Sequence, residues 1–144
     1  MSELFRYFQI ISKHSNEYLD TKLKEYELCS CHRIFIKKIY ENPGITRDKL
    51  KNIAHVHPSN TTRAIDYLEE KGYITKQNKE EDKRICALYP SEKLEVVYNV
   101  LVNAENEWIN IITKGMSEDE IDLYKSLLKK SSDLSIDCIH KKRD

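Results

Sequence analysis

The chain has 144 residues, of which 40% are hydrophobic and 33% charged, and its 24 basic and 24 acidic side chains give a net charge of zero. This composition excludes a disordered chain, and the length suits a single domain, residues 1–144, with a buried core. The three glycines and three prolines favour long helices over a fold with many turns. DNA-binding domains are often basic, so the zero net charge counts mildly against a DNA partner unless charge is concentrated on one face.

The amino-terminal segment shows neither a secretion signal nor a membrane span. Glu3 and Arg6 interrupt its apolar pattern, and no stretch approaches the roughly 18 apolar residues that a membrane span needs. We therefore expect a cytoplasmic protein without membrane contact. In that compartment the four cysteines are expected to be thiols rather than disulfides.

A first long helix is predicted over residues 4–26. Leu4, Phe8 and Ile11 recur at helical spacing, and Leu19 resumes the stripe after a polar middle. Because the apolar surface is split in this way, the first part of the helix is a candidate for packing against another subunit.

Two shorter helices are predicted next. The first covers residues 31–41 and ends at Asn-Pro-Gly, residues 42–44, because proline cannot continue the hydrogen-bond ladder and its neighbours suit a turn. The second covers residues 47–54, with Thr46 as its N-cap.

The central helix is predicted over residues 57–72, where Pro58 suits the first turn and Gly72 the left-handed position past the end. An inward stripe follows the helical period: Thr61, Ile65 and Leu68. The opposite, polar face consists of Ser59, Asn60, Thr62, Arg63, Asp66 and Tyr67. Such a face suits a recognition helix in the major groove of DNA, and an ordinary amphipathic helix with a solvated face is the alternative.

After residue 72 the apolar pattern alternates. It predicts strands over residues 73–77 and 84–89, joined by a polar, mostly charged tip at residues 78–83. Two short helices around a turn, followed at once by a charged hairpin, are typical of a winged helix-turn-helix.

Two helices are predicted to complete the chain, one over residues 92–114 and one after Ser117, which forms a capping box with Glu120. The terminal helices hold more apolar surface than a winged-helix core of this size needs. We therefore expect dimerisation, with a larger monomeric helical core as the alternative. A two-fold dimer would present two recognition helices about one DNA turn apart, roughly 34 Å.

The predicted fold class is thus mainly α with a small β-hairpin wing. Residues 32–90 form a winged helix-turn-helix DNA-binding lobe, and residues 1–28 and 91–144 form the helical dimerisation region that flanks it.

Four pieces of the chain together resemble the MarR family of bacterial transcription regulators. They are residues 42–46 (NPGIT), 59–63 (SNTTR), 68–74 (LEEKGYI) and 82–84 (DKR). The resemblance implies a homodimeric winged-helix regulator that binds a near-palindromic DNA operator, with the central helix in the major groove and the wing at the minor groove. We expect this regulator to be a repressor. It implies no cofactor.

The resemblance also implies roles for two wing residues. The arginine matching Arg84 reaches into the minor groove, and the aspartate matching Asp82 holds it in place. A narrow minor groove attracts a guanidinium, and a carboxylate fixes its planar fork. The alternative is a surface ion pair of little energetic meaning.

We expect DNA contacts from the start of the second short helix, from the central helix and from the wing. The candidates are Thr46, Arg47, His57, Ser59, Asn60, Thr62, Arg63, Lys79, Asp82, Lys83 and Arg84. A bidentate contact from Arg63 to guanine would contribute roughly 1–3 kcal/mol of discrimination.

The Cys29, Cys31 and His32 cluster is the one constellation that could carry other chemistry. Thiolates and imidazoles bind zinc, and thiolates are redox-active. A second ligand pair at conventional spacing is absent from the sequence, so no metal is assigned. Small buried residues at a helix start, a redox sensor and a metal-responsive site remain the alternatives.

Catalytic motifs are absent from the sequence, including a glycine-rich phosphate loop, Gly-x-Ser-x-Gly and His-Glu-x-x-His, so an enzyme is not expected. The alternative function is a winged-helix module that binds protein, or a thiol- or metal-based sensor without sequence-specific DNA binding. Zero net charge and the acidic residues Glu80 and Glu81 favour this alternative, whereas Arg63 and Arg84 favour DNA.

In the MarR family, small anionic aromatic ligands or oxidants often act in a cleft between the dimer helices and the DNA-binding lobe. The resemblance therefore implies a small-molecule effector for this chain. Aromatic side chains are candidates for lining such a pocket, with core packing as the alternative: Tyr18, Tyr26, Tyr40 and Trp108.

Overall fold

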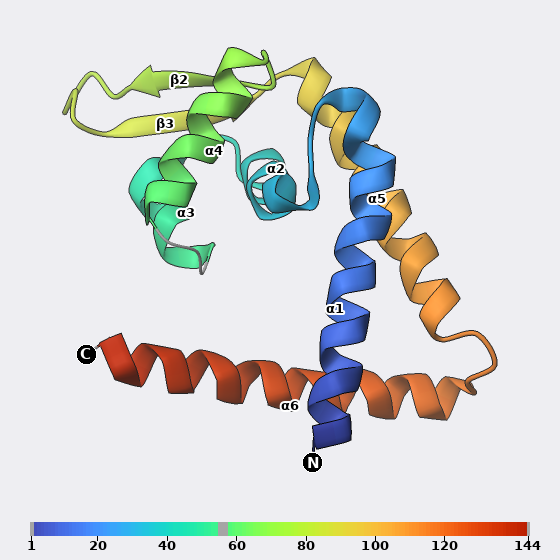
Figure 1. Cartoon of the computed structure of the whole chain (residues 1–144). Coiled ribbons are helices and arrows are strands. Elements are labelled where there is room, and N and C mark those ends of the chain that lie inside the picture. Colours follow the sequence, from blue (N-terminus) through green and yellow to red (C-terminus); the bar gives the residue numbers. More distant parts are fainter. Residues whose placement is uncertain (1, 55–57, 144) are drawn as a thin grey trace. The chain divides into compact units, whose positions relative to one another are not determined.

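The computed structural model describes residues 2–54 and 58–143, which form two compact units, Met1–Trp108 and Ile109–Asp144 (Figure 1). The elements of the first unit are α1 (Ser2–Leu23), the 3-10 turns η1 (Lys24–Tyr26) and η2 (Ser30–His32), α2 (Arg33–Glu41), β1 (Ile45–Thr46), α3 (Arg47–Ile53), α4 (Pro58–Glu70), β2 (Ile74–Asn78), β3 (Cys86–Pro90) and most of α5 (Glu92–Ile112). The second unit contains α6 (Glu118–Arg143). Within the described residues, no helix combines the length and the apolar character needed to cross a membrane.

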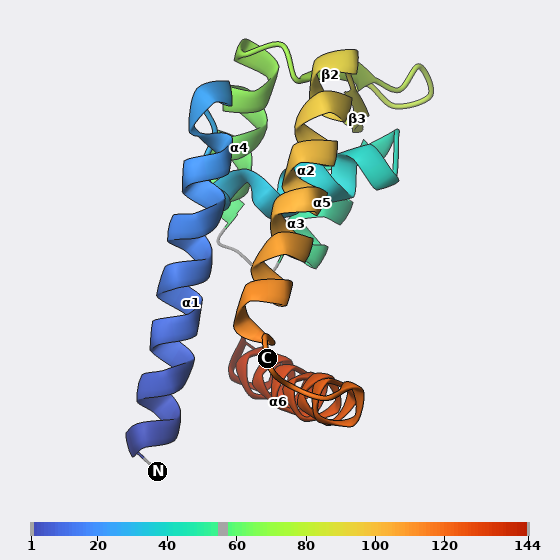
Figure 2. The same ribbon diagram turned by 90° about the vertical axis from the view of Figure 1, so that its right-hand side faces the viewer.

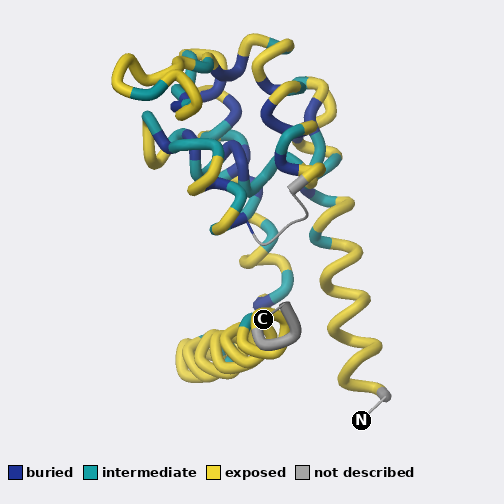
Figure 3. The backbone as a smooth tube through the Cα atoms, turned by 90° about the vertical axis from the view of Figure 1, so that its left-hand side faces the viewer, coloured by how far each residue is buried: buried dark blue, intermediate teal, exposed yellow. Residues whose placement is uncertain are grey.

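The hydrophobic core of the first unit lies where α2, α3, α4 and α5 meet the small sheet. Figure 2 shows these helices grouped around the strands, and Figure 3 shows that buried positions gather there while the amino-terminal half of α1 is exposed. The side chains of the core with no exposed surface are Leu23, Ile36, Ile39, Leu50, Ile65, Leu68, Leu88, Leu94, Val97 and Leu101. The core therefore holds the short helices in a defined arrangement against the sheet.

The sheet has three antiparallel strands in the order β1-β3-β2. The hairpin of β2 and β3 confirms the predicted wing, and its register pairs Lys76 with Leu88. The third strand, β1, was not expected, because a strand of two residues is too short to show an alternating pattern. It pairs Ile45 with Leu88, after a tight turn in which Gly44 has a φ of +87° and its N–H donates to the Leu88 carbonyl at 2.8 Å.

Several predicted helix ends are confirmed. Thr46 caps α3 by accepting a hydrogen bond from Lys49 N–H at 3.2 Å, and Gly72 takes the left-handed conformation beyond α4, with φ +82°. Glu120 N–H donates to Ser117 Oγ at 3.1 Å, as a capping box requires. The first helix differs from its prediction, because the α-helical part ends at Leu23 and a 3-10 turn continues to Tyr26.

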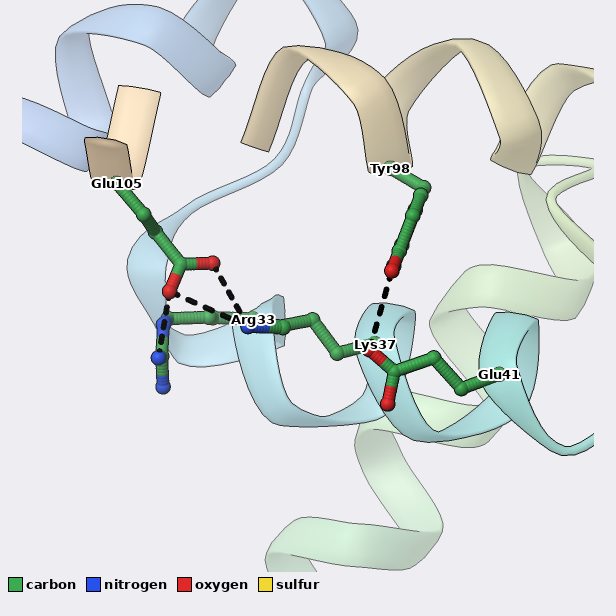
Figure 4. Close-up of polar contacts among 5 residues, drawn as sticks. All are labelled: Arg33, Lys37, Glu41, Tyr98 and Glu105. Carbon is green, nitrogen blue, oxygen red and sulfur yellow. Dashed lines mark hydrogen bonds and ion pairs between the residues drawn. The ribbon is translucent and has the colours of Figure 1, made fainter. Parts of the chain in front are cut away.

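Polar contacts join α2 to α5 within the first unit (Figure 4). Glu105 accepts a hydrogen bond from Arg33 at 2.7 Å and pairs with Lys37 at 3.2 Å, while Tyr98 OH donates to Glu41 at 3.1 Å. The three α2 residues are spaced by four, so they lie on one face of that helix, toward α5. These contacts fix the orientation of α2 against the longer helix.

Apolar side chains remain exposed on α1 and on α6, each considered by itself. On α1 they are Leu4, Phe5, Tyr7, Phe8, Ile10 and Ile11, and on α6 they are Leu123, Leu127, Leu128, Leu134 and Ile139. Exposed apolar surface of this extent is typical of a protein–protein interface.

Candidate nucleic-acid interface

Helix α4 presents one buried and one polar face, as its sequence predicts. Thr61, Ile65 and Leu68 have no exposed surface, which confirms the inward stripe. Ser59, Asn60 and Arg63 are exposed, and Thr62 is half-buried. The polar side chains therefore lie in the first turns of α4, where the helix dipole also favours an anionic partner.

Tyr67, which was predicted on the polar face of α4, is half-buried rather than exposed. Its ring stacks on His32 with a centroid distance of 4.9 Å and an interplanar angle of 8°. Its hydroxyl donates a hydrogen bond to the Glu27 backbone carbonyl. The aromatic ring is half-buried because the turn before α2 covers it, and that turn lies far from α4 in the sequence.

Asp66, an acid on the outer face of α4, is paired with a lysine of the wing. Lys76 Nζ lies 2.6 Å from Asp66 Oδ1 and 3.5 Å from Glu69 Oε1. The hydrogen bond from Lys76 lowers the pKa of Asp66 below its ordinary value, so the pair stays ionised near neutral pH. The negative charge of Asp66 is therefore balanced locally, and the contact connects α4 to β2.

Within the wing, Asp82 holds Arg84 in a fixed orientation. Asp82 Oδ1 accepts hydrogen bonds from the Arg84 backbone N–H at 3.0 Å and from Nε at 3.1 Å, and Oδ2 lies 3.3 Å from Nη2. The Arg84 side chain is nevertheless 90% exposed. The hydrogen bond from Arg84 lowers the pKa of Asp82, so the carboxylate remains charged at neutral pH. The Arg84 guanidinium is thus both held in one orientation and accessible to solvent.

The other predicted DNA contacts occupy varied environments. Lys79 and Lys83 are exposed beside Arg84. The hydroxyl of Thr46 already accepts a hydrogen bond as the α3 cap, and Arg47 Nε is buried without a hydrogen-bond partner among the residues that the structure describes. His57 lies outside the described residues. Direct contact with DNA remains a prediction for each of them.

The four aromatic residues predicted to line a ligand pocket make separate packing contacts. Tyr18 lies 5.4 Å from Trp108, measured between ring centroids, and its hydroxyl donates to Glu107 at 2.8 Å. Tyr40 stacks on Tyr98 at 4.1 Å. The carbonyl of Tyr26 accepts a hydrogen bond from Tyr73 at 2.6 Å. Their role in binding an effector therefore remains a prediction.

A pocket of about 520 Å³ lies between α4 and the start of α2. It is lined by Cys31, His32, Phe35, Asn60, Arg63, Ala64 and Tyr67. The sequence did not predict this pocket, because its walls come from two segments almost thirty positions apart whose proximity depends on helix packing. It opens beside Arg63 on the exposed face of α4.

The structure joins Cys29 and Cys31 in a disulfide, so the expectation of four thiols is wrong for this pair. The tight turn η2 brings their Cα atoms to 5.2 Å, within the range that a disulfide spans. Cys86 and Cys138 are free, as expected. Burial lowers the pKa of the neighbouring His32, which favours its neutral imidazole form.

Helices α3 and α4 and the hairpin of β2 and β3 together define a winged helix-turn-helix protein. The profile of the MarR family matches residues 35–86. The chain is 30% identical over 119 residues to the HTH-type transcriptional regulator BilQ of Clostridioides difficile, covering 83% of this chain and 78% of the relative. The chain belongs to the MarR family of transcriptional regulators.

Solved structures agree with this assignment. A MarR protein from Peptoclostridium difficile DA00132 superposes with a TM-score of 0.85 at 32% identity, over 92% of this chain and 86% of that one. A structure from Listeria monocytogenes, assigned to the MarR family of transcriptional regulators and complexed with a 26mer DNA, superposes with a TM-score of 0.84 at 27% identity, over 97% and 94% of the two chains.

Proposed function

We propose that this protein is a homodimeric, non-enzymatic repressor that binds a near-palindromic DNA operator through α4 in the major groove and the β2–β3 wing at the minor groove. The observation that carries the proposal is the exposed Arg84 guanidinium, held by Asp82 at the edge of the wing. The DNA complex of the Listeria monocytogenes relative supports the same class of partner. In this proposal residues 32–90 are the DNA-binding lobe.

Local charge makes the proposal compatible with a net charge of zero. Lys76 balances Asp66 on the outer side of α4, while Arg63, Lys79 and Lys83 are exposed. Electrostatic attraction to phosphate depends on the charge of the approaching face rather than on the charge of the whole chain. We propose that a small ligand or an oxidant modulates this binding.

Operator binding is tested by selection from a random pool of duplex DNA. The expected result is enrichment of an inverted repeat whose half-sites lie about one helical turn apart, roughly 34 Å. The affinity for the selected DNA should fall steeply as the salt concentration rises, because binding to phosphates releases counterions. A folded dimer that enriches no sequence would favour the alternative, a protein-binding module that uses the acidic tip at Glu80 and Glu81.

The dimer is proposed to form through residues 1–28 and 91–144. The exposed apolar side chains of α1 and of α6 lie in these segments. Exposure of apolar surface to water is unfavourable, so burial against a partner stabilises it. A second copy of the chain supplies the same apolar surface by two-fold symmetry. Dimerisation also explains how one short recognition helix per chain can read a palindromic site.

Phe8→Glu and Leu127→Glu, made separately, are each expected to convert the dimer to a monomer. Phe8 is 63% exposed on α1 and Leu127 is 51% exposed on α6 in the single chain, so a glutamate is tolerated by the monomer but not by an apolar interface. Sedimentation equilibrium at low micromolar concentration measures the change. Ile85→Glu, an exposed apolar residue of the wing, is the matched control and should remain dimeric. A parent protein that sediments as a monomer would contradict the proposed interface.

A further inference from the structure

We propose that Cys29, Cys31 and His32, once the cysteines are reduced, bind a thiophilic d10 metal ion, Zn²⁺ or Cu⁺, and that this site acts on the recognition helix. The three ligand atoms lie within 4.8 Å of one another. His32 Nδ1 is 3.5 Å from Cys29 Sγ and 3.7 Å from Cys31 Sγ. Two sulfurs and one imidazole nitrogen form a donor set that these ions prefer over oxygen ligands.

Hydrogen bonds hold the backbone segment that carries the three donors. The Ser30 N–H donates to Asp20 Oδ1 at 2.6 Å, which attaches the turn to α1. The His32 N–H donates to the Cys29 carbonyl at 3.0 Å and closes the turn. Because all three ligands lie within four consecutive residues, bringing them together closes only a very short loop.

His32 has the tautomer that a metal ligand requires. The Cys29 N–H donates to His32 Nδ1 at 3.1 Å, so Nδ1 carries the lone pair, and the ring proton of the neutral imidazole is assigned to Nε2. A metal ion between the two sulfurs would replace that N–H as the partner of Nδ1. Zn²⁺ would complete its fourth position with water, whereas Cu⁺ is satisfied by fewer ligands.

Metal binding requires reduction of the disulfide that the structure contains. A dithiol reductant transfers two electrons and two protons, the Sγ–Sγ bond breaks to give two thiols, and the reductant becomes a disulfide. The metal ion then replaces the proton of each thiol, and two protons are released to solvent.

The site is open to solvent and touches α4. Cys31 is exposed and lines the 520 Å³ pocket together with His32, so an ion can enter from the solvent. The His32 ring stacks on Tyr67 of α4 at 4.9 Å, and Arg63 and Asn60 of the same helix line the pocket. A change in the position of His32 on ligation would therefore be transmitted to the helix that carries the proposed DNA contacts. This second step rests on the proposed function.

The test measures Zn²⁺ affinity without DNA, by competition with a chromophoric chelator, on the fully reduced full-length protein under anaerobic conditions. We expect uptake of one Zn²⁺ per chain, and a loss of affinity of at least about tenfold in Cys31→Ser and in His32→Phe, since each removes a ligand. Phenylalanine keeps an aromatic ring to stack on Tyr67. Replacing Zn²⁺ with Co²⁺ should give thiolate-to-cobalt charge-transfer absorption, and Cys31→Ser should weaken this absorption because only the Cys29 thiolate remains.

The double variant Cys86→Ser/Cys138→Ser is the matched control, because it removes the two free cysteines and leaves the cluster intact. It should bind Zn²⁺ as the parent does. No uptake by the reduced parent, or unchanged affinity in Cys31→Ser, would overturn the site. With binding intact, an operator affinity that Zn²⁺ does not alter would overturn only the coupling to α4, and absence of any operator binding would count instead against the proposed function.

Discussion

Arg84→Ala is expected to lower operator affinity by roughly 5- to 150-fold, the equivalent of about 1–3 kcal/mol, without loss of the fold. The side chain is 90% exposed and contributes nothing to the core, so its removal acts on binding alone. In the proposed complex the guanidinium enters the minor groove, where its charge and its planar fork are both used. Titration of the selected operator by fluorescence anisotropy measures the loss, and circular dichroism checks the fold.

Asp82→Asn, measured in the same titration, distinguishes two roles of Asp82: orienting the Arg84 guanidinium and contributing a negative charge near DNA. A carboxylate near DNA repels phosphate, so a purely electrostatic role for Asp82 predicts that its neutralisation raises affinity. If Asp82 positions Arg84 through its two oxygens, as the distances of 3.1 and 3.3 Å indicate, the variant should instead bind more weakly. Lys13→Ala, which removes an exposed positive charge from α1, is the control for a general charge effect. Equal affinities for Arg84→Ala and the parent would contradict the role of the wing.

Arg63→Ala is also expected to lower operator affinity. The kind of loss should show whether Arg63 contacts a base or a phosphate. Arg63 is exposed near the start of α4, from where its guanidinium can contact either a guanine edge or a phosphate. A guanine contact predicts that a repeated selection with the variant loses its preference at one position of each half-site. A phosphate contact predicts uniformly weaker binding with a smaller dependence on salt.

Leu68→Ala is expected to destabilise the fold by about 2–5 kcal/mol, because it removes a fully buried side chain and leaves a cavity in a packed core. Leu68 lies on the inward face of α4, so the loss also loosens the recognition helix. Since a whole domain is stable by only about 5–15 kcal/mol, this change approaches the limit of what the fold tolerates. The midpoint of urea unfolding, at fixed protein concentration, measures it.

Ile85→Ala provides the comparison for that measurement. Ile85 is also a large aliphatic residue, but it is 37% exposed in the wing, so its truncation should change the unfolding free energy much less. Protein concentration has to be held constant because association of two chains adds to the apparent stability. An unfolding midpoint for Leu68→Ala equal to that of the parent would show that the inward stripe of α4 does not support the core.

Features that depend on neighbouring residues could be predicted from the sequence. Helical spacing identified the buried face of α4, and proline and glycine marked its two ends. The threonine before α3 and the serine before α6 identified their caps, and alternation identified the wing. Each of these signals acts over a few residues, within one turn of helix or one strand, so it can be read without knowledge of the fold.

Contacts between distant segments became visible only in the folded chain. The pairing of β1 with β3, the stacking of Tyr67 on His32, and the neutralisation of Asp66 by Lys76 all join residues that no local pattern connects. The same is true of the pocket beside Arg63, whose walls come from η2, α2 and α4. These contacts arise because burying the apolar faces of several helices against one sheet fixes their relative positions, and polar groups then find partners across the resulting interfaces.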